Sequence, residues 1–287
     1  MATGDDDIEL YVEGVGDPSG PPLVLIAGHG AQLLFWHPEL VDAFVARGFF
    51  VVRFDNRDVG LSTHLDAAGV PDVWAAALGG TEAVPYLIED MADDVAGMLA
   101  AMGLGAAHVL GISLGGMIAQ SLAIRHGDRV ASLTSLMSTP APLAVGTPRD
   151  EVIEQWLAPS PTSREGIIEA SVASARRHGS PLLGLDEPWL RELAGASFDR
   201  CFDPDGVTRQ LAAVVASPDR RPGLAQVAVP TLVVHGADDP VVTVEGGEAT
   251  ADAVPGARLV IFDKMGHDIP RAIWPALVDD VAALAGR

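Results

Sequence analysis

The chain has 287 residues, 48% of them hydrophobic, which is enough to bury the core of one large domain or of one domain with an insertion. Its formal net charge of −21 argues against nucleic acid and anionic membrane surfaces as partners, because both bind basic patches. The single cysteine, Cys201, excludes an internal disulfide. The N-terminus shows no secretory signal and no apolar run reaches the roughly 20 residues that span a bilayer, so we expect a soluble, cytoplasmic protein.

Apolar runs alternate with helical patterns along most of the chain. In chain order, the expected strands are 8–12, 22–27, 49–55, 107–112, 130–138, 230–236 and 257–263. The expected helices among them are 37–48, 87–103, 114–127 and 275–286, with a further helix after the strand at 230–236. Strands that alternate with helices predict an α/β fold with a mainly parallel, doubly wound sheet.

Residues 139–225 interrupt this alternation. The segment is rich in Pro, Ser and Arg and has helical patterns at 150–158, 164–179 and 187–197, but it contains no evident strand. We interpret it as a helical lid insertion over the carboxyl ends of the strands. The core is then formed by 1–138 and 226–287.

The stretch "GISLG", residues 111–115, places Ser113 between an apolar strand and a helix. Small residues on both sides permit a sharp turn that lifts the serine hydroxyl above the edge of the sheet. A tight turn with a capping serine is the alternative interpretation. A serine hydroxyl needs a neighbouring base to become a nucleophile, and a carboxylate to orient that base.

Among the eight histidines, His267 is the best candidate for the base. It follows the strand at 257–263 in the loop "DKMGHDIP", and ligands of a doubly wound sheet bind outside the carboxyl ends of its strands. Apart from His29, the others are expected to be structural, surface or capping groups: His37, His64, His108, His126, His178 and His235.

The carboxylate should also follow a strand, and "GADDPVV" offers Asp238 and Asp239. We favour Asp239, because Pro240 and two valines after it can anchor the loop. Asp238 is then a turn residue. The chain order Ser, Asp, His is that of α/β hydrolases.

Acyl transfer builds negative charge on a carbonyl oxygen, which two backbone N–H groups normally bind. One should be that of Leu114, the residue after the serine. The other should come from the loop "GHGAQ" after the strand at 22–27, with the His29 N–H as first choice and Gly30 as second. A flexible glycine loop without this role is the alternative.

The motifs "LIAGHG", "FDNRDVGLS", "GISLGG", "HGADDPVV" and "MGHDIP" resemble those of the α/β-hydrolase superfamily over nearly the full chain. More narrowly, the chain is similar to the aclacinomycin methylesterase branch of bacterial serine esterases. The resemblance implies an eight-stranded sheet, with Ser113, Asp239 and His267 as the triad and His29 and Leu114 as oxyanion donors. In the second motif Asp58 stands where the superfamily usually has glycine, and we expect it to shape the wall of the site.

We therefore predict a serine carboxylic ester hydrolase acting through an acyl-enzyme, and we expect methyl esters of bulky polyketide-like molecules as its substrates. Perhydrolase (non-metal haloperoxidase), thioesterase and lactonase activities use the same triad and stay open, as does a hydrolase-fold ligand receptor. We expect no metal and no other cofactor, since no ligand-cluster motif is present. A small-molecule ester is the expected partner of a monomer or dimer. Candidate pocket residues are aromatic: Trp36, Trp74, Trp156, Trp189, Phe198 and Phe202.

Overall fold

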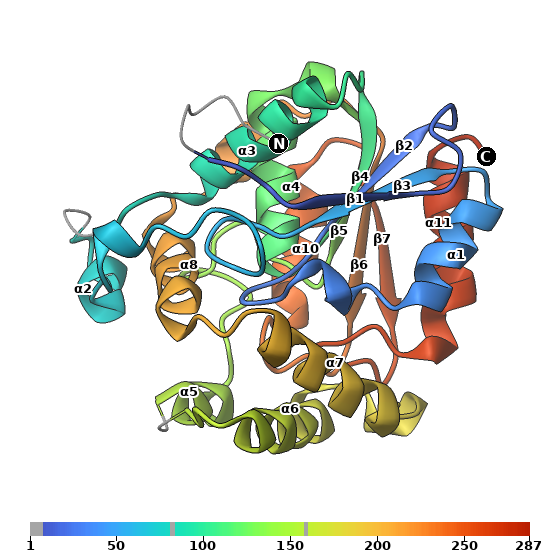
Figure 1. The fold of residues 1–287 in the computed structure, drawn as a ribbon. Coiled ribbons are helices and arrows are strands. Elements are labelled where there is room, and N and C mark those ends of the chain that lie inside the picture. The colour runs from blue at the N-terminus through green and yellow to red at the C-terminus, as the bar shows by residue number, and fades with distance from the viewer. Residues whose placement is uncertain (1–7, 81–83, 158–159) are drawn as a thin grey trace.

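A computed structural model describes residues 8–80, 84–157 and 160–287 as one central sheet flanked by helices (Figure 1). The strands are β1 Val12–Val15, β2 Pro22–Ile26, β3 Phe50–Phe54, β4 Ala107–Ile112, β5 Val130–Leu136, β6 Thr231–Gly236 and β7 Arg258–Phe262. They lie in the order β1-β3-β2-β4-β5-β6-β7. The pair β1–β3 is antiparallel and every other neighbouring pair is parallel, so the predicted α/β class and mainly parallel sheet are confirmed.

The described residues form seven strands rather than the expected eight. The segment expected as a strand at 8–12 enters the sheet only at Val12. Upstream, the N–H groups of Glu9 and Tyr11 donate to side-chain oxygens, those of Thr63 and Ser62, instead of to backbone carbonyls. The carbonyls of Glu9 and Tyr11 do accept backbone N–H groups, those of Thr63 and Asp55. Because the N–H groups of the segment bind side chains, it runs beside the 62–63 turn without forming a regular strand.

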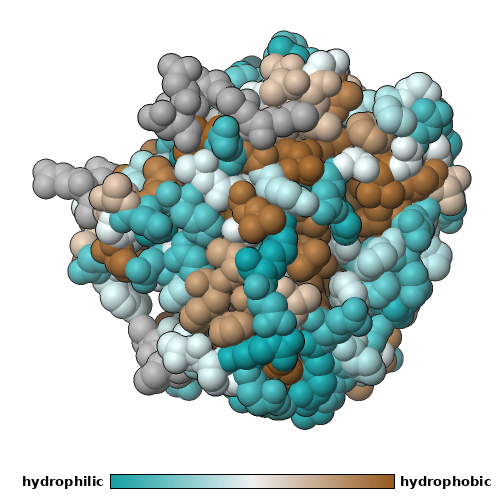
Figure 2. Space-filling view, in the orientation of Figure 1, coloured by the Kyte–Doolittle hydropathy of each residue, from teal (hydrophilic) through white to brown (hydrophobic). Residues whose placement is uncertain are grey.

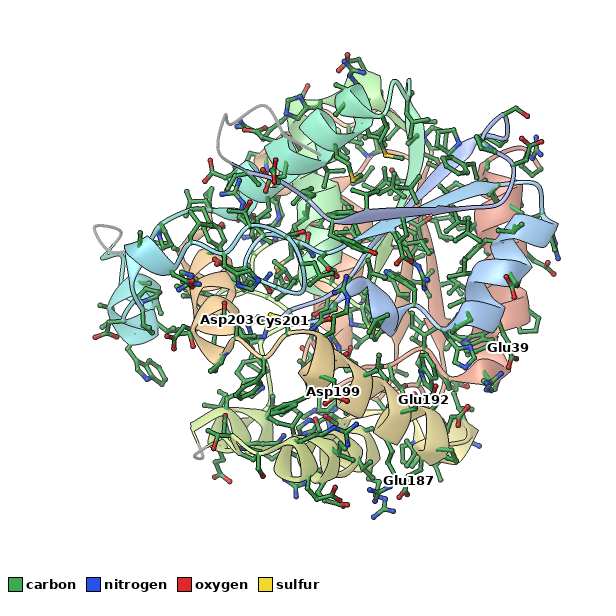
Figure 3. All side chains as sticks on the ribbon, in the orientation of Figure 1. Glu39, Glu187, Glu192, Asp199, Cys201 and Asp203 are labelled. Carbon is green, nitrogen blue, oxygen red and sulfur yellow. The ribbon has the colours of Figure 1, made fainter. Side chains whose placement is uncertain are left out.

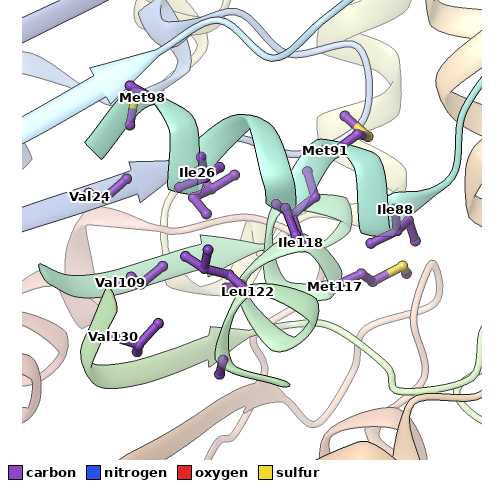
Figure 4. Packing of buried hydrophobic residues seen from close by; sticks show 14 of the residues in the cluster. Val24, Ile26, Ile88, Met91, Met98, Val109, Met117, Ile118, Leu122 and Val130 are labelled. Carbon is purple, nitrogen blue, oxygen red and sulfur yellow. The ribbon is translucent and has the colours of Figure 1, made fainter. Parts of the chain in front are cut away.

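Helices cover both faces of the sheet. On one face lie α1 Pro38–Ala46 and α11 Trp274–Leu284, and on the other lie α3 Ile88–Ala101, α4 Leu114–Arg125 and α10 Val244–Ala253. Alternate residues of a strand point to opposite faces. In β2, Leu23 and Leu25 accordingly pack under α1 and α11, while Val24 and Ile26 pack under α3 and α4 (Figure 4). Both faces are apolar because both are buried.

Among the described residues, five α-helices lie between β5 and β6. They are α5 Asp150–Leu157, α6 Arg164–His178, α7 Glu187–Arg200, α8 Pro204–Ala216 and α9 Arg221–Leu224. Helices α6 and α7 pack against each other, and their outer surface is largely hydrophilic (Figure 2). Ion pairs such as Arg164–Asp199 at 2.8 Å lie across this surface. The boundaries 139 and 225, and the lid role of this segment, stay predictions.

Helix α8 and the short α2, Val73–Ala77, were not expected from the sequence. The start of α8 reads "DPDG", which resembles a turn, but here Asp203 is the N-cap and accepts a hydrogen bond from the Gly206 N–H at 2.9 Å. Pro204 occupies the first helical position, which its fixed φ suits. None of the helices in the described ranges combines the length and apolar character of a membrane crossing.

Candidate active site

Four parallel strands end at one edge of the sheet, and each is followed by a predicted site residue. Ser113 comes directly after β4, while Asp239 and His267 lie in the loops after β6 and β7. His29 lies in the loop after β2. Loops at the carboxyl edge of a doubly wound sheet form its ligand crevice, so the topology assembles these residues although they are far apart in sequence.

Ser113 has a strained backbone, with φ 54° and ψ −119°. Non-glycine residues rarely adopt positive φ, and when they do so between a strand and a helix the side chain is presented at a sharp turn. The turn needs glycines around it. A Cβ on Gly111 would lie 2.0 Å from the Gly115 oxygen, and one on Gly115 would lie 2.1 Å from the Ile26 oxygen.

A chain of hydrogen bonds joins Ser113, His267 and Asp239. Nε2 of His267 lies 3.0 Å from the Ser113 Oγ, and Nδ1 of His267 lies 2.7 Å from Oδ2 of Asp239. The second carboxylate oxygen of Asp239 accepts the N–H groups of Val241 and Val242 at 2.8 and 3.0 Å. Asp239 is 1% exposed, whereas Asp238 is on the surface. The structure therefore brings Asp239, and not Asp238, to the histidine.

The loop that carries His267 is held by the end of α6. The His267 N–H donates to the His178 carbonyl at 2.7 Å, and the Gly266 N–H donates to the Ser180 Oγ at 2.8 Å. The N–H and hydroxyl of Ser180 both donate to Asp268. Burial raises the pKa of Asp268, and these hydrogen bonds offset only part of that rise. Sequence patterns did not single out Ser180, because its partners lie more than 80 positions away.

The two predicted oxyanion donors are available. Within the described part of the chain, neither the His29 N–H nor the Leu114 N–H donates a hydrogen bond to another protein atom. The Gly30 N–H, the second choice, is already bound to Oε1 of Gln210 at 2.9 Å. The Ser113 carbonyl accepts a hydrogen bond from the Ser138 hydroxyl at 2.8 Å, which helps to hold the turn in place.

The candidate pocket tryptophans do not all line one cavity. Trp36 is fully buried, and together with Trp189 and Ile269 it lines a cavity of about 100 Å³ beside the His267 loop. Trp189 packs on His37 with ring centroids 4.3 Å apart. Trp74 on α2 and Trp156 on α5 are 62% and 49% exposed and do not line this cavity. Phe198 and Phe202 pack against each other, with their ring centroids 4.8 Å apart.

A second cluster of titratable groups lies between α7, α8 and the turn after β3. Side-chain oxygen and nitrogen atoms of Asp58, His64 and Asp203 lie within 4.8 Å of one another. The Cys201 Sγ lies 3.7 Å from Nε2 of His64, and Figure 3 shows Cys201 next to Asp203. A cation is already present, because the Arg209 guanidinium lies 2.8 Å from Asp58 and 3.4 Å from Asp203. The arrangement is therefore an internal ion-pair network that joins α8 to the core.

Comparison with known proteins agrees with this architecture. A family model described as the alpha/beta hydrolase fold matches residues 21–270. Two rhodomycin D methylesterases, DauP of Streptomyces sp. (strain C5) and DnrP of Streptomyces peucetius, are each 30% identical to the chain over 97% of it and 95% of their own length. The crystal structure of the enol-lactonase from Burkholderia xenovorans LB400 has a TM-score of 0.76 at 25% identity and covers 100% of this chain and 99% of that one. The resemblance drawn from the motifs is thus confirmed, and the chain belongs to the alpha/beta hydrolase family.

Proposed function

We propose that the protein is a serine carboxylic ester hydrolase that works through an acyl-enzyme. The observation that carries the proposal is the continuous hydrogen-bonded chain from Asp239 through His267 to Ser113 at the carboxyl edge of the sheet. Each member has the chemistry that its position requires: a hydroxyl to attack, an imidazole to accept a proton, and a buried carboxylate to orient the imidazole.

In the first half of the reaction, Nε2 of His267 takes the hydroxyl proton while the Ser113 Oγ attacks the ester carbonyl. The Nδ1–H of His267 donates to Asp239, so the imidazole is held in the tautomer whose Nε2 is free to accept. The buried Asp239 carboxylate then stabilises the imidazolium that forms. His267 returns the proton to the leaving alcohol.

In the second half, His267 removes a proton from water, which attacks the acyl group and releases the acid from Ser113. Both halves pass through a tetrahedral oxyanion. We assign its stabilisation to the N–H groups of His29 and Leu114, which no other group of the described chain occupies. Donors that are fixed before the charge develops need no reorganisation in the transition state.

For the substrate, we propose a methyl ester on a bulky, polyketide-like acyl group. Support comes from the two rhodomycin D methylesterases, which match the chain over almost its full length. Residues 139–225 would then act as the lid that selects the substrate, because the sheet supplies the machinery common to the family. The aromatic residues Trp156 and Trp189 are candidates for contacts with the bulky group.

Lactone hydrolysis is the second candidate, favoured by the full-length structural match to an enol-lactonase. A lactone is an internal ester, so the same triad opens it by the same two steps, and the alcohol stays attached to the acid. Only the shape of the pocket needs to differ.

The test is a panel of p-nitrophenyl esters, aromatic methyl esters, lactones and thioesters, together with a peracid-formation assay, applied to wild type and Ser113→Ala. We expect many turnovers on esters, highest kcat/KM on methyl esters of bulky acids, and loss of turnover in Ser113→Ala. Higher kcat/KM on lactones would favour the second candidate. A single slow turnover by wild type on every substrate would contradict an enzymatic role and favour a ligand receptor.

A further inference from the structure

Helix α8 of the insertion contacts the loop that carries His29. Gln210 is fully buried, and its Oε1 accepts the Gly30 N–H at 2.9 Å while its Nε2 donates to the Arg57 carbonyl at 2.8 Å. One turn earlier, the Val207 carbonyl accepts the Nε2–H of His29 at 2.8 Å. A single helix thus binds the backbone of the loop and the side chain of the proposed donor residue.

The loop has unusual freedom without these contacts, because His29 lies between Gly28 and Gly30. Gly30 adopts φ +66°, and glycines permit rotations of the neighbouring peptides that other residues resist. The peptide that joins His29 to Gly30 is planar, so binding its N–H to Gln210 also directs the His29 carbonyl to the opposite side. A rotated peptide would change which groups of the loop face the substrate oxygen.

We propose that Gln210 is a positioning residue for the oxyanion site, an inference that rests on the proposed function. By holding the Gly30 N–H on one side and the Arg57 carbonyl on the other, its side-chain amide fixes the conformation in which the His29 N–H is free and directed at the site. Gln210 does not touch the substrate. Through it, the insertion takes part in the chemistry as well as in the choice of substrate.

The second anchor of α8 supports this interpretation. Arg209, next to Gln210 in sequence, is 1% exposed and binds Asp58 at 2.8 Å, in the same turn whose Arg57 carbonyl binds Gln210. The helix is therefore fixed to the core beside the amide that binds the loop. An amide held from both sides restrains its partner more than a free side chain would, because its rotamer freedom is already lost.

The test replaces Gln210 by methionine, which has nearly the same shape and offers neither hydrogen bond. Gln120 gives the matched control. It is also fully buried and makes two hydrogen bonds, donating to Ser135 at 3.1 Å and accepting from Arg220 at 3.1 Å, but it lies on α4 away from the loop. Each variant leaves two partners without a hydrogen bond, and in Gln120→Met one of these partners is the charged Arg220. Activity and affinity are therefore compared per folded protein, and a difference between the two variants reports on the oxyanion loop.

We expect Gln210→Met to lower kcat on p-nitrophenyl acetate about 10- to 100-fold, a part of the loss that follows removal of an oxyanion donor, with little change in KM. Affinity for trifluoroacetophenone should fall in parallel, because its adduct with the serine places an oxyanion at the same donors. Gln120→Met should keep both quantities within about twofold of wild type. If Gln210→Met matches Gln120→Met in both quantities, the proposal is overturned.

Two further measurements keep the outcome decisive. If Gln210→Met does not fold, Gln210→Asn replaces it, with Gln120→Asn as the control. The asparagine amide is one methylene shorter and cannot reach both the Gly30 N–H and the Arg57 carbonyl, so we expect the same differences in kcat and affinity. Their absence would overturn the proposal in the same way. Failure of the proposed function would show itself differently. Wild type and Ser113→Ala would then be equally inactive, and wild type would not bind the ketone.

Discussion

Arg209 of α8 and Asp58 of the turn after β3 form an ion pair at 2.8 Å in which both side chains are almost completely buried. Asp58 has φ 67°, the left-handed region, at a position where the superfamily motif usually has glycine. A side chain there costs backbone strain of about 1 kcal/mol or more. The carboxylate also accepts the Leu65 N–H at 2.8 Å, so the strain is offset by contacts that glycine could not make.

Restoring glycine at this position should therefore destabilise the protein. Asp58→Gly relieves the strain but removes a buried partner of Arg209, a loss that typically costs about 3–5 kcal/mol. Asp66 and Asp203, at 3.2 and 3.4 Å, keep part of the compensation. We expect a net loss of about 1–3 kcal/mol in the free energy of unfolding in urea.

The double variant Asp58→Gly with Arg209→Met provides the control. With both charges gone, no unpaired cation remains buried, so the double variant should be more stable than Asp58→Gly alone. A single Asp58→Gly variant as stable as wild type would show that the ion pair contributes nothing beyond the strain it requires.

The assignment of the carboxylate is tested by two neighbouring substitutions. In Asp239→Asn, the amide oxygen can still accept the Val241 and Val242 N–H groups, which turns the NH₂ group toward Nδ1 of His267. Nδ1 must then accept a hydrogen bond from the amide, which places the ring proton on Nε2. Nε2 can no longer take the Ser113 proton, so kcat should fall about 10²–10⁴-fold. Asp238→Asn lies on the surface and should retain activity. An inactive Asp238→Asn beside an active Asp239→Asn would reverse the assignment.

Ser180 should matter to His267 in a similar indirect way. Ser180→Ala leaves the Gly266 N–H and part of the Asp268 carboxylate without a partner, and the base then moves relative to Ser113. We expect kcat to fall about 10- to 100-fold on a small ester. Ser217→Ala is the matched control, since that hydroxyl is also buried and accepts the Ile88 N–H at 2.9 Å, far from the base. Equal kcat in the two variants would contradict a positioning role for Ser180.

The sequence predicts the parts of this molecule that local patterns determine. Apolar runs bounded by turns located β2 to β7, and strand ends located Ser113, Asp239 and His267, because the crevice of a parallel sheet lies at those ends. Contacts made by the helices between β5 and β6 have no such signal. Gly30 and Gln210 are 180 positions apart, and a buried glutamine in a helix carries no motif.

The tryptophans illustrate the same limit. Aromatic residues in a lid predict a pocket only if their helices turn them inward, and tertiary packing decides that. Trp189 faces a cavity beside the His267 loop, while Trp156 on α5 is half exposed. Helix α8 was missed for a local reason, since "DPDG" is a good turn sequence as well as a helix start.

His64 should make stability depend on pH above neutrality. Both of its ring nitrogens face acceptors, Oδ2 of Asp203 at 2.5 Å and the Gly60 carbonyl at 3.1 Å, so the doubly protonated imidazolium fits the site best. Burial alone would lower the pKa of His64, but the hydrogen bonds to Asp203 and Gly60 outweigh it and raise the pKa above 6.5. A folded-state pKa above the unfolded value means that the folded protein holds this proton more tightly.

The stabilisation is therefore complete below pH 6.5 and is lost as the pH rises through the folded-state pKa. We expect the free energy of unfolding of wild type to fall, relative to that of His64→Gln, as the pH rises above 6.5 in urea titrations. His108→Gln is the control of opposite sign. Burial lowers the pKa of His108, so its contribution is lost only as the pH falls below 6.5. If wild type and His64→Gln keep a constant difference across the alkaline range, the imidazolium does not form, and the ionic part of the link between α8 and the turn after β3 comes from Arg209 and not from His64.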